Sequence, residues 1–407
     1  EDVHDEVEVV EQDPFGLLHA FGKGWPFAEI LLEPVLHRFR DRGDLPRVLS
    51  GADQEVVGES PCRSEVENDH VGRLRFAARL GVISGNLAGV FDDFSADQMT
   101  SAFHNRSLVR GPAMRATLHT VTANDYLELR GSYSEALKNS LNLLGKRAEG
   151  LDQDLVMRAA MKLLKRQPQD FDQIREALVE QFPGVNDRAL GYTVRMLLPL
   201  VMIPSSDTWG FPRNAQFALA EEWLGESIKP DPGDQRIVRR YLQAFGPATP
   251  ADFTAWSAIK GAKKLFDQID DEPVQFKDEA GRIYYDLDDA PRPGADIDAP
   301  VRLLPEFDNI MLAHADRKRI IDDKFKPHVV TKNLRVRAAF LVDGEAAGLW
   351  NVKRTKKLAT LTLEPFGKLT KRNATLLSKE AEQLLAFSES TIQDHRVVVG
   401  DPLGAAK

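Results

Sequence analysis

The chain has 407 residues, with 53 Lys and Arg against 62 Asp and Glu and a formal net charge of −9. Its length predicts two to four structural units. No apolar run is long enough to span a bilayer, and the single Cys62 excludes both a disulfide framework and a Cys-rich zinc site. Residues 1–5 show no signal-peptide pattern, and the single cysteine favours the reducing cytoplasm. We also expect a monomer that has no membrane segment, cofactor or metal.

The acidic excess is confined to the first part of the chain. Residues 1–75 hold 17 Asp and Glu and 8 Lys and Arg, a net of −9, so the remainder holds 45 of each. A neutral body can still present local basic faces, and the bulk charge therefore does not exclude a nucleic acid. Residues 1–91 lack sustained helical periodicity, and we expect a loosely packed acidic extension there.

From residue 92 onward the chain organises into helices followed by strand pairs, and this order occurs three times. In the first unit, 92–150, Gly111-Pro112 is expected to break the chain before an alternating run, 114–121, that predicts a strand. A helix follows from about residue 124. One face of the predicted strand carries three polar side chains: Arg115, Thr117 and His119.

The second unit, 151–222, predicts three helices, at 152–164, at 171–181 and from 186 to near Pro199. The third of these helices has an apolar stripe on one side. The opposite side carries three residues suited to docking against a nucleic acid: Arg188, Tyr192 and Arg195. The loop at 205–210 would form the tip of the strand pair.

The third unit, 223–293, predicts helices at 236–245 and 250–259, with a further apolar stripe at 262–269. A hairpin at 273–285 completes it, and Pro291–Gly294 is typical of a linker.

The C-terminal region, 294–390, predicts mostly strands. Arg335–Val342 and Ala346–Val352 flank Asp343-Gly344, a tight-hairpin signal, and another strand is expected at 359–364. A helix at about 369–387 and a loose tail over 391–407 follow. At the expected tip of a hairpin lie four cations that suit contact with a phosphate backbone: Lys353, Arg354, Lys356 and Lys357.

Four sequence blocks, in order, carry a family resemblance from Phe94 to Ser390. They are the run from Arg110 to His119, the run Leu197–Val201 with Trp209-Gly210 and Glu221–Gly225, the run Tyr241–Phe253, and Leu303–Asp308 with Leu363–Phe366. The set resembles the bacterial AlkZ-like winged-helix family. The resemblance implies an α+β, mainly helical chain of tandem winged-helix units followed by a small β-barrel-like domain, forming a concave surface that binds double-stranded DNA.

The same resemblance implies repair chemistry for some members, which excise alkylated or crosslinked bases as DNA glycosylases. Those members carry a Gln-x-Gln or Gln-x-Asp motif upstream of the first wing, and residues 1–90 contain neither. Gln167-Pro168-Gln169 and Gln268-Ile269-Asp270 match the pattern but occur in later units, and we interpret both as coincidence. Three hypotheses stay open: a DNA-binding protein without activity, such as a regulator or damage sensor; an active monofunctional glycosylase; and a structural protein.

Each candidate residue has a structural alternative. His119 is the candidate for proton transfer or phosphate contact, and a hydrogen-bonded structural histidine is an equal alternative. Arg115 is interpreted as a phosphate contact, with an internal ion pair as its alternative. Glu306 and Asp308 favour capping or ion pairing over acid–base chemistry. The sequence has no phosphate-binding glycine loop, His-rich metal spacing or Gly-x-Ser-x-Gly elbow.

Overall fold

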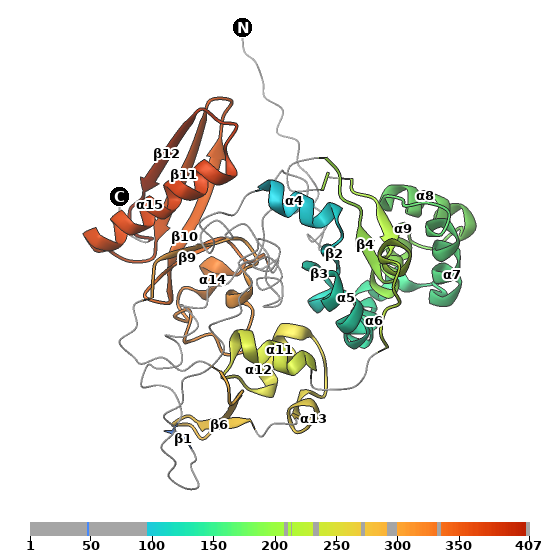
Figure 1. Ribbon diagram of the computed structural model, residues 1–407, viewed down its shortest axis with the longest axis horizontal. Helices are drawn as coiled ribbons and strands as arrows, with labels where there is room; N and C mark the ends of the chain where they lie inside the picture. Colours follow the sequence, from blue (N-terminus) through green and yellow to red (C-terminus); the bar gives the residue numbers. More distant parts are fainter. Residues whose placement is uncertain are drawn as a thin grey trace.

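The computed structural model describes residues 47–48, 96–206, 211–212, 214–230, 236–269, 273–290, 299–331 and 335–403. These residues form an α+β protein with four separate sheets. Figure 1 shows the helices α7–α9 on one side, the C-terminal sheet on the other, and the hairpin β2–β3 between them. Except for strand β1 (Arg47–Val48), which pairs with β6, the expected extension over 1–91 lies outside the described residues.

The first unit is a hairpin surrounded by short helices. Its elements are α4 (Ala96–His104), β2 (Leu108–Pro112), η2 (Met114–Ala116), β3 (Leu118–Thr122), α5 (Ala123–Leu129), η3 (Gly131–Tyr133), α6 (Ser134–Ser140) and η4 (Leu141–Ala148). The expected break at Gly111-Pro112 is wrong, because both residues lie inside β2. Gly111 is needed for close packing instead, since a Cβ there would lie 2.4 Å from the Leu200 carbonyl oxygen of the neighbouring hairpin.

The predicted strand 114–121 is also interrupted. Arg115 and Ala116 have positive φ angles of 53° and 60°, a left-handed conformation that non-glycine residues adopt at a cost, so the chain turns there and β3 starts only at Leu118. Arg115 therefore lies in the hairpin turn and does not share a strand face with His119. The turn is closed by Ala113 N–H donating to Thr117 O and Thr117 N–H donating to Met114 O.

The second unit has three helices followed by a hairpin. Its elements are α7 (Gln153–Leu164), α8 (Phe171–Gln181), α9 (Asp187–Leu197), β4 (Leu200–Met202), β5 (Phe217–Leu219) and α10 (Ala220–Leu224). The three predicted helices are confirmed. Each begins after a side chain that accepts a hydrogen bond from the first turn, in order Asp152, Asp170 and Asn186. Of the expected tip at 205–210, residues 207–210 lie outside the described residues.

Helix α9 belongs to two hydrophobic cores. Leu190 and Val194 are fully buried in the core of the second unit, against α7 and α8. Ala189 and Met196 are buried in the large core shared by the first unit, the third unit and part of the C-terminal region. Burial on two sides leaves only a narrow third side of this helix for another contact.

The third unit repeats the order of three helices and a hairpin. Its elements are α11 (Arg236–Phe245), α12 (Pro250–Ser257), α13 (Ala262–Phe266), β6 (Val274–Lys277) and β7 (Ile283–Asp286). Ion pairs join α11 to α5 of the first unit: Asp125 to Arg240 at 2.6 Å and Glu128 to Arg236 at 3.2 Å. The predicted linker at 291–294 lies outside the described residues.

The C-terminal region is a five-stranded sheet with one long helix across it. Its elements are β8 (Arg302–Leu304), η6 (Asn309–Met311), α14 (Lys326–Val329), β9 (Ala339–Val342), β10 (Glu345–Arg354), β11 (Leu358–Pro365), α15 (Lys371–Ser388) and β12 (Asp394–Val399). The strand order β12-β11-β10-β9-β8 leaves β12 and β8 as edges, so the described residues form an open sheet and not a closed barrel. The tight turn at Asp343-Gly344 is confirmed, with positive φ at both residues.

The expectation of a loose tail after Thr391 is wrong for residues 394–399. They form β12, which pairs in parallel with β11 from Leu358↔Asp394 to Leu363↔Val399. Parallel pairing needs a crossover connection, and α15 provides it. The expected strand at 335–342 is shorter than predicted, because β9 starts at Ala339.

Candidate nucleic-acid interface

Arg115 joins three parts of the molecule. From the turn between β2 and β3, its guanidinium donates to the backbone oxygen of Trp256, at the end of α12. It also donates to Oδ1 of the fully buried Asn309 at 3.0 Å. These contacts hold the first hairpin against both the third unit and the C-terminal region.

His119 is buried and neutral. Its Nδ1 lies 3.1 Å from Thr117 O, so the proton is on Nδ1, and Nε2 has no hydrogen-bond partner among the described residues. Burial, followed by the nearby charge of Arg115, lowers the pKa of His119 to about 3. A base with that pKa binds protons weakly at neutral pH, so the geometry favours the structural interpretation over proton transfer. Thr117 is also engaged, since Oγ1 donates to Met114 O.

The three residues predicted to contact a nucleic acid lie on the outward side of α9, but they differ in how far they are exposed to solvent. Arg188 is exposed, whereas Tyr192 and Arg195 are half-buried. The Nε of Arg195 is enclosed without a hydrogen-bond partner among the described residues, and its guanidinium lies 5.9 Å from the centre of the Phe171 ring. Burial lowers the pKa of Arg195 below its usual value. An enclosed N–H donor without an acceptor is costly, and an anion that reaches this Nε would offset that cost.

The β10–β11 hairpin separates its four cations into two kinds. Arg354 is held by a bidentate ion pair with the buried carboxylate of Glu389, with Nε 2.6 Å from Oε2. Lys353, Lys356 and Lys357 are exposed and have no acidic partner in the part of the chain that the structure describes. The sequence predicted one cluster, but the structure leaves only these three lysines free for another partner.

We expect Arg354→Ala to lower the free energy of unfolding by about 3 kcal/mol, because it leaves the Glu389 carboxylate buried without its partner. Lys353→Ala, one residue away and exposed, should change it by less than about 0.5 kcal/mol. Urea unfolding of both variants measures the difference. Equal stability of the two variants would contradict the assignment of Arg354 to Glu389.

The two carboxylates of the Leu303–Asp308 block have structural roles, as predicted. Glu306 forms an ion pair with Arg335. Asp308 is fully buried, and its Oδ1 accepts from the backbone N–H of Ile310 at the start of η6. Gln169, of the first Gln-x-Gln match, pairs its backbone with Phe217 in the second hairpin, and Asp270 of the second match lies outside the described residues.

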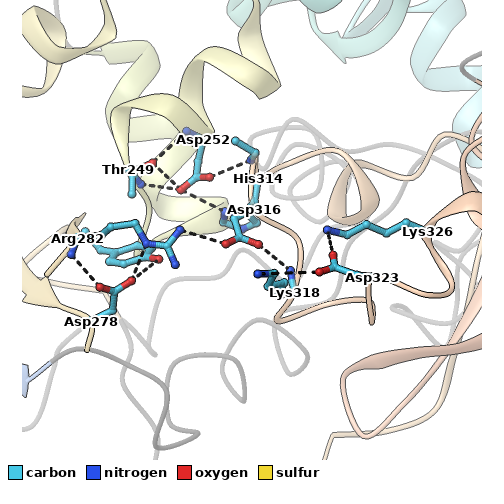
Figure 2. Close-up of polar contacts among 11 residues, drawn as sticks. Thr249, Asp252, Asp278, Arg282, His314, Asp316, Lys318, Asp323 and Lys326 are labelled. Carbon is cyan, nitrogen blue, oxygen red and sulfur yellow. Dashed lines mark hydrogen bonds and ion pairs between the residues drawn. The ribbon is translucent and has the colours of Figure 1, made fainter. Parts of the chain in front are cut away.

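A buried carboxylate that sequence analysis missed lies in the first turn of α12 and contacts the C-terminal region. Asp252 accepts from Thr249 N–H (2.9 Å) and Thr249 Oγ1 (2.8 Å) through Oδ2, and from Ala315 N–H (2.9 Å) through Oδ1. His314 Nδ1 lies 3.9 Å from Asp252 Oδ2 (Figure 2). The Thr-x-x-Asp spacing at the start of α12 was a signal for the reciprocal cap, but nothing in the sequence places His314 beside it.

Burial opposes ionisation of Asp252, but His314 and the Thr249 donors outweigh it and hold its pKa well below the usual range. Burial also lowers the pKa of His314. Below this pair in Figure 2, Arg282 joins Asp278 at 2.7 Å and Asp316 at 3.0 Å. The cluster attaches the third unit to the C-terminal region. Its carboxylates already accept hydrogen bonds or form ion pairs within the protein, so the cluster has a structural role.

A polar cavity of about 560 Å³ lies at the open end of the β2–β3 hairpin. Two of its charged residues are already engaged: Arg106 lies over the ring of Trp223, and Asp125 pairs with Arg240. The described residues contain no group of three His, Cys, Asp or Glu placed to hold a metal ion. None of the helices they form is long and apolar enough to cross a membrane.

Comparison with known proteins agrees with this architecture. The model of the family described as DNA glycosylase AlkZ-like matches residues 90–387. Among solved structures, the Streptomyces sahachiroi DNA glycosylase AlkZ is similar, with a TM-score of 0.59, 19% identity, and coverage of 74% of this chain and 85% of that one. The search of curated proteins found no match.

These findings define first an α+β protein with the fold seen in a DNA glycosylase. The chain belongs to the AlkZ-like DNA glycosylase family. Membership supports a glycosylase-like function in DNA repair and implies DNA binding.

Proposed function

We propose that this chain is a monomeric, cytoplasmic duplex-DNA-binding protein built from tandem winged-helix units. The order of three helices and a hairpin, found in α7–α9 with β4–β5 and again in α11–α13 with β6–β7, supports that architecture. In a winged helix the third helix enters the major groove. The third helix of the second unit is α9, whose outward side carries Arg188, Tyr192 and Arg195.

The observation that carries the proposal is the turn between β10 and β11. Lys353, near the end of β10, and Lys356 and Lys357, in the turn that follows, are exposed at the tip of one hairpin. The structure shows no acid paired with them in its described part. Repulsion among three cations this close is relieved by a polyanion, and a phosphate backbone supplies one. Arg115, Thr117 and His119 are assigned to positioning the first hairpin, because their polar groups are engaged or enclosed.

We expect the variant Lys353→Ala/Lys356→Ala/Lys357→Ala to bind duplex DNA about 100-fold more weakly near 0.1 M salt. Each lost phosphate contact reduces the slope of log affinity against log salt by about 0.9, so the slope should fall by two to three. Fluorescence anisotropy with a labelled duplex measures both. A variant with alanine at Lys162 and Lys165, two exposed lysines at the end of α7, is the control and should keep the full slope.

The second candidate function is base excision, which family membership favours. Of the residues that the sequence analysis weighed for acid–base chemistry, His119 has a strongly lowered pKa and Glu306 and Asp308 are engaged in structural contacts. The activity would therefore depend on other residues. Incubation with N7-alkylated duplex, followed by an assay for abasic sites, decides the question. Release of base establishes a glycosylase, and no release at high protein concentration leaves DNA binding alone.

A further inference from the structure

We infer that the exposed side of α15 is a second contact surface for the phosphate backbone of duplex DNA, separate from the β10–β11 turn. This inference rests on the proposed DNA binding. The surface consists of Lys368, Lys371, Arg372 and Lys379, with Thr375 and Leu376 between them. All six side chains are exposed, and we call them the α15 basic face.

The geometry of the helix places these residues on one side. Lys371, Thr375 and Lys379 follow one another at intervals of four residues, and Arg372 and Leu376 lie beside that line. The opposite side holds Leu377, Ala381 and Leu385, which are fully buried against the sheet. Because the packed side fixes the rotation of α15, the basic face has one orientation and points away from the sheet.

Within the described part of the chain, none of these cations forms an ion pair. The first turn of α15 contains no acidic residue, although the positive end of the helix dipole lies there. Glu380 is turned inward, where Oε1 accepts from Leu303 N–H at 2.8 Å and Oε2 faces Arg302. Glu382 is an exposed carboxylate in the fourth turn, three residues after Lys379, but it forms no ion pair with that lysine.

Two cations at the positive end of a helix dipole cost the helix some stability, and an external anion removes that cost. From Lys371 to Lys379 the helix rises about 12 Å, and over that length of the duplex axis one DNA strand presents three to four phosphates. A row of this length matches a polyanion better than a single anion. Leu376 adds an apolar side chain that a deoxyribose ring can contact.

The test is the variant Lys371→Glu/Arg372→Glu/Lys379→Glu, measured with a 40-base-pair duplex by anisotropy across a salt series. We expect affinity to fall at least tenfold at 0.1 M salt and the salt slope to fall by two to three. Glutamates in the first turn suit the helix dipole, so thermal unfolding should not occur earlier than in the wild type. Should it do so, the variant with glutamine at the same three positions repeats the test with less disturbance.

The outcomes separate this inference from the proposed function. A wild-type slope retained in both variants overturns the α15 contact and leaves DNA binding in place. A wild-type protein that shows no salt-dependent affinity for duplex removes the proposed function and this inference together. Reversal of the two exposed lysines Lys162 and Lys165 to Glu is the matched control, and a loss of slope there equal to that of the α15 variant would also overturn the specific contact.

Discussion

Asp252→Asn is expected to lower the free energy of unfolding by about 3 kcal/mol at pH 7. The carboxylate accepts three hydrogen bonds in a buried setting, two from Thr249 and one from Ala315. An amide retains one accepting oxygen and presents N–H groups to the remaining donors. Urea unfolding measures the loss. Asp322→Asn is the control that should change little, because it removes an exposed ion pair with Lys324 and keeps an oxygen that can accept from the Lys324 backbone N–H.

The loss should also depend on pH with a defined sign. Folding lowers the pKa of Asp252. The contribution of its ionised carboxylate to the free energy of unfolding is therefore fully present above the pKa of an unfolded Asp, about 3.9. It is lost as the pH falls through the lower pKa of the folded protein. The wild type and Asp252→Asn should therefore become more alike in stability as the solution is acidified below pH 4. A gap that stays constant down to pH 2 would show that the carboxylate charge has no part in it.

His119→Gln should flatten the pH dependence of stability below pH 6.5. Folding lowers the pKa of His119 to about 3. Between pH 6.5 and pH 3, His119 is therefore protonated in the unfolded chain and neutral in the folded protein. Because protonation favours the unfolded state, the wild type loses stability as the pH falls through this range. Glutamine cannot titrate. Between pH 8 and pH 4.5, the free energy of unfolding of the wild type should fall by about 2 to 3 kcal/mol more than that of the variant.

Urea unfolding at pH 8, 6.5, 5.5 and 4.5 measures this difference. His314 is also buried with a lowered pKa, but both proteins contain it, so the difference between their curves isolates His119. Parallel curves over the whole range would show that His119 reaches solvent and can protonate, and would restore it as a candidate acid or base.

Sequence patterns predicted the second unit well because its signals are local. Asp152, Asp170 and Asn186 mark three helix starts, and each helix has apolar residues at helical spacing that pack in the core of the second unit. The turn at Asp343-Gly344 was predictable for the same reason, since two residues with positive φ determine it. Such features need only neighbours within one turn of chain.

The candidate site was harder to predict because tertiary contacts decide it. Arg115 has the pattern of a strand residue, but its partners Trp256 and Asn309 are more than 140 residues away, and they hold the turn in a left-handed conformation. Arg354 and Lys353 look equivalent in sequence, and only the approach of Glu389 separates them. Strand β12 was missed because its first residues, Asp394-His395-Arg396, are polar and do not show the pattern of a strand. It is an edge strand that forms by pairing with β11.

The double burial of α9 has a mechanical consequence. A helix that contributes to two cores cannot turn or slide without disturbing both, so the second unit is held at one angle to the rest of the molecule. On the proposal that a duplex lies across these units, the protein is the rigid partner and the DNA must supply the bend. Preference among sequences would then follow the stiffness of the duplex, with flexible pyrimidine–purine steps bound more tightly than stiff A-tracts.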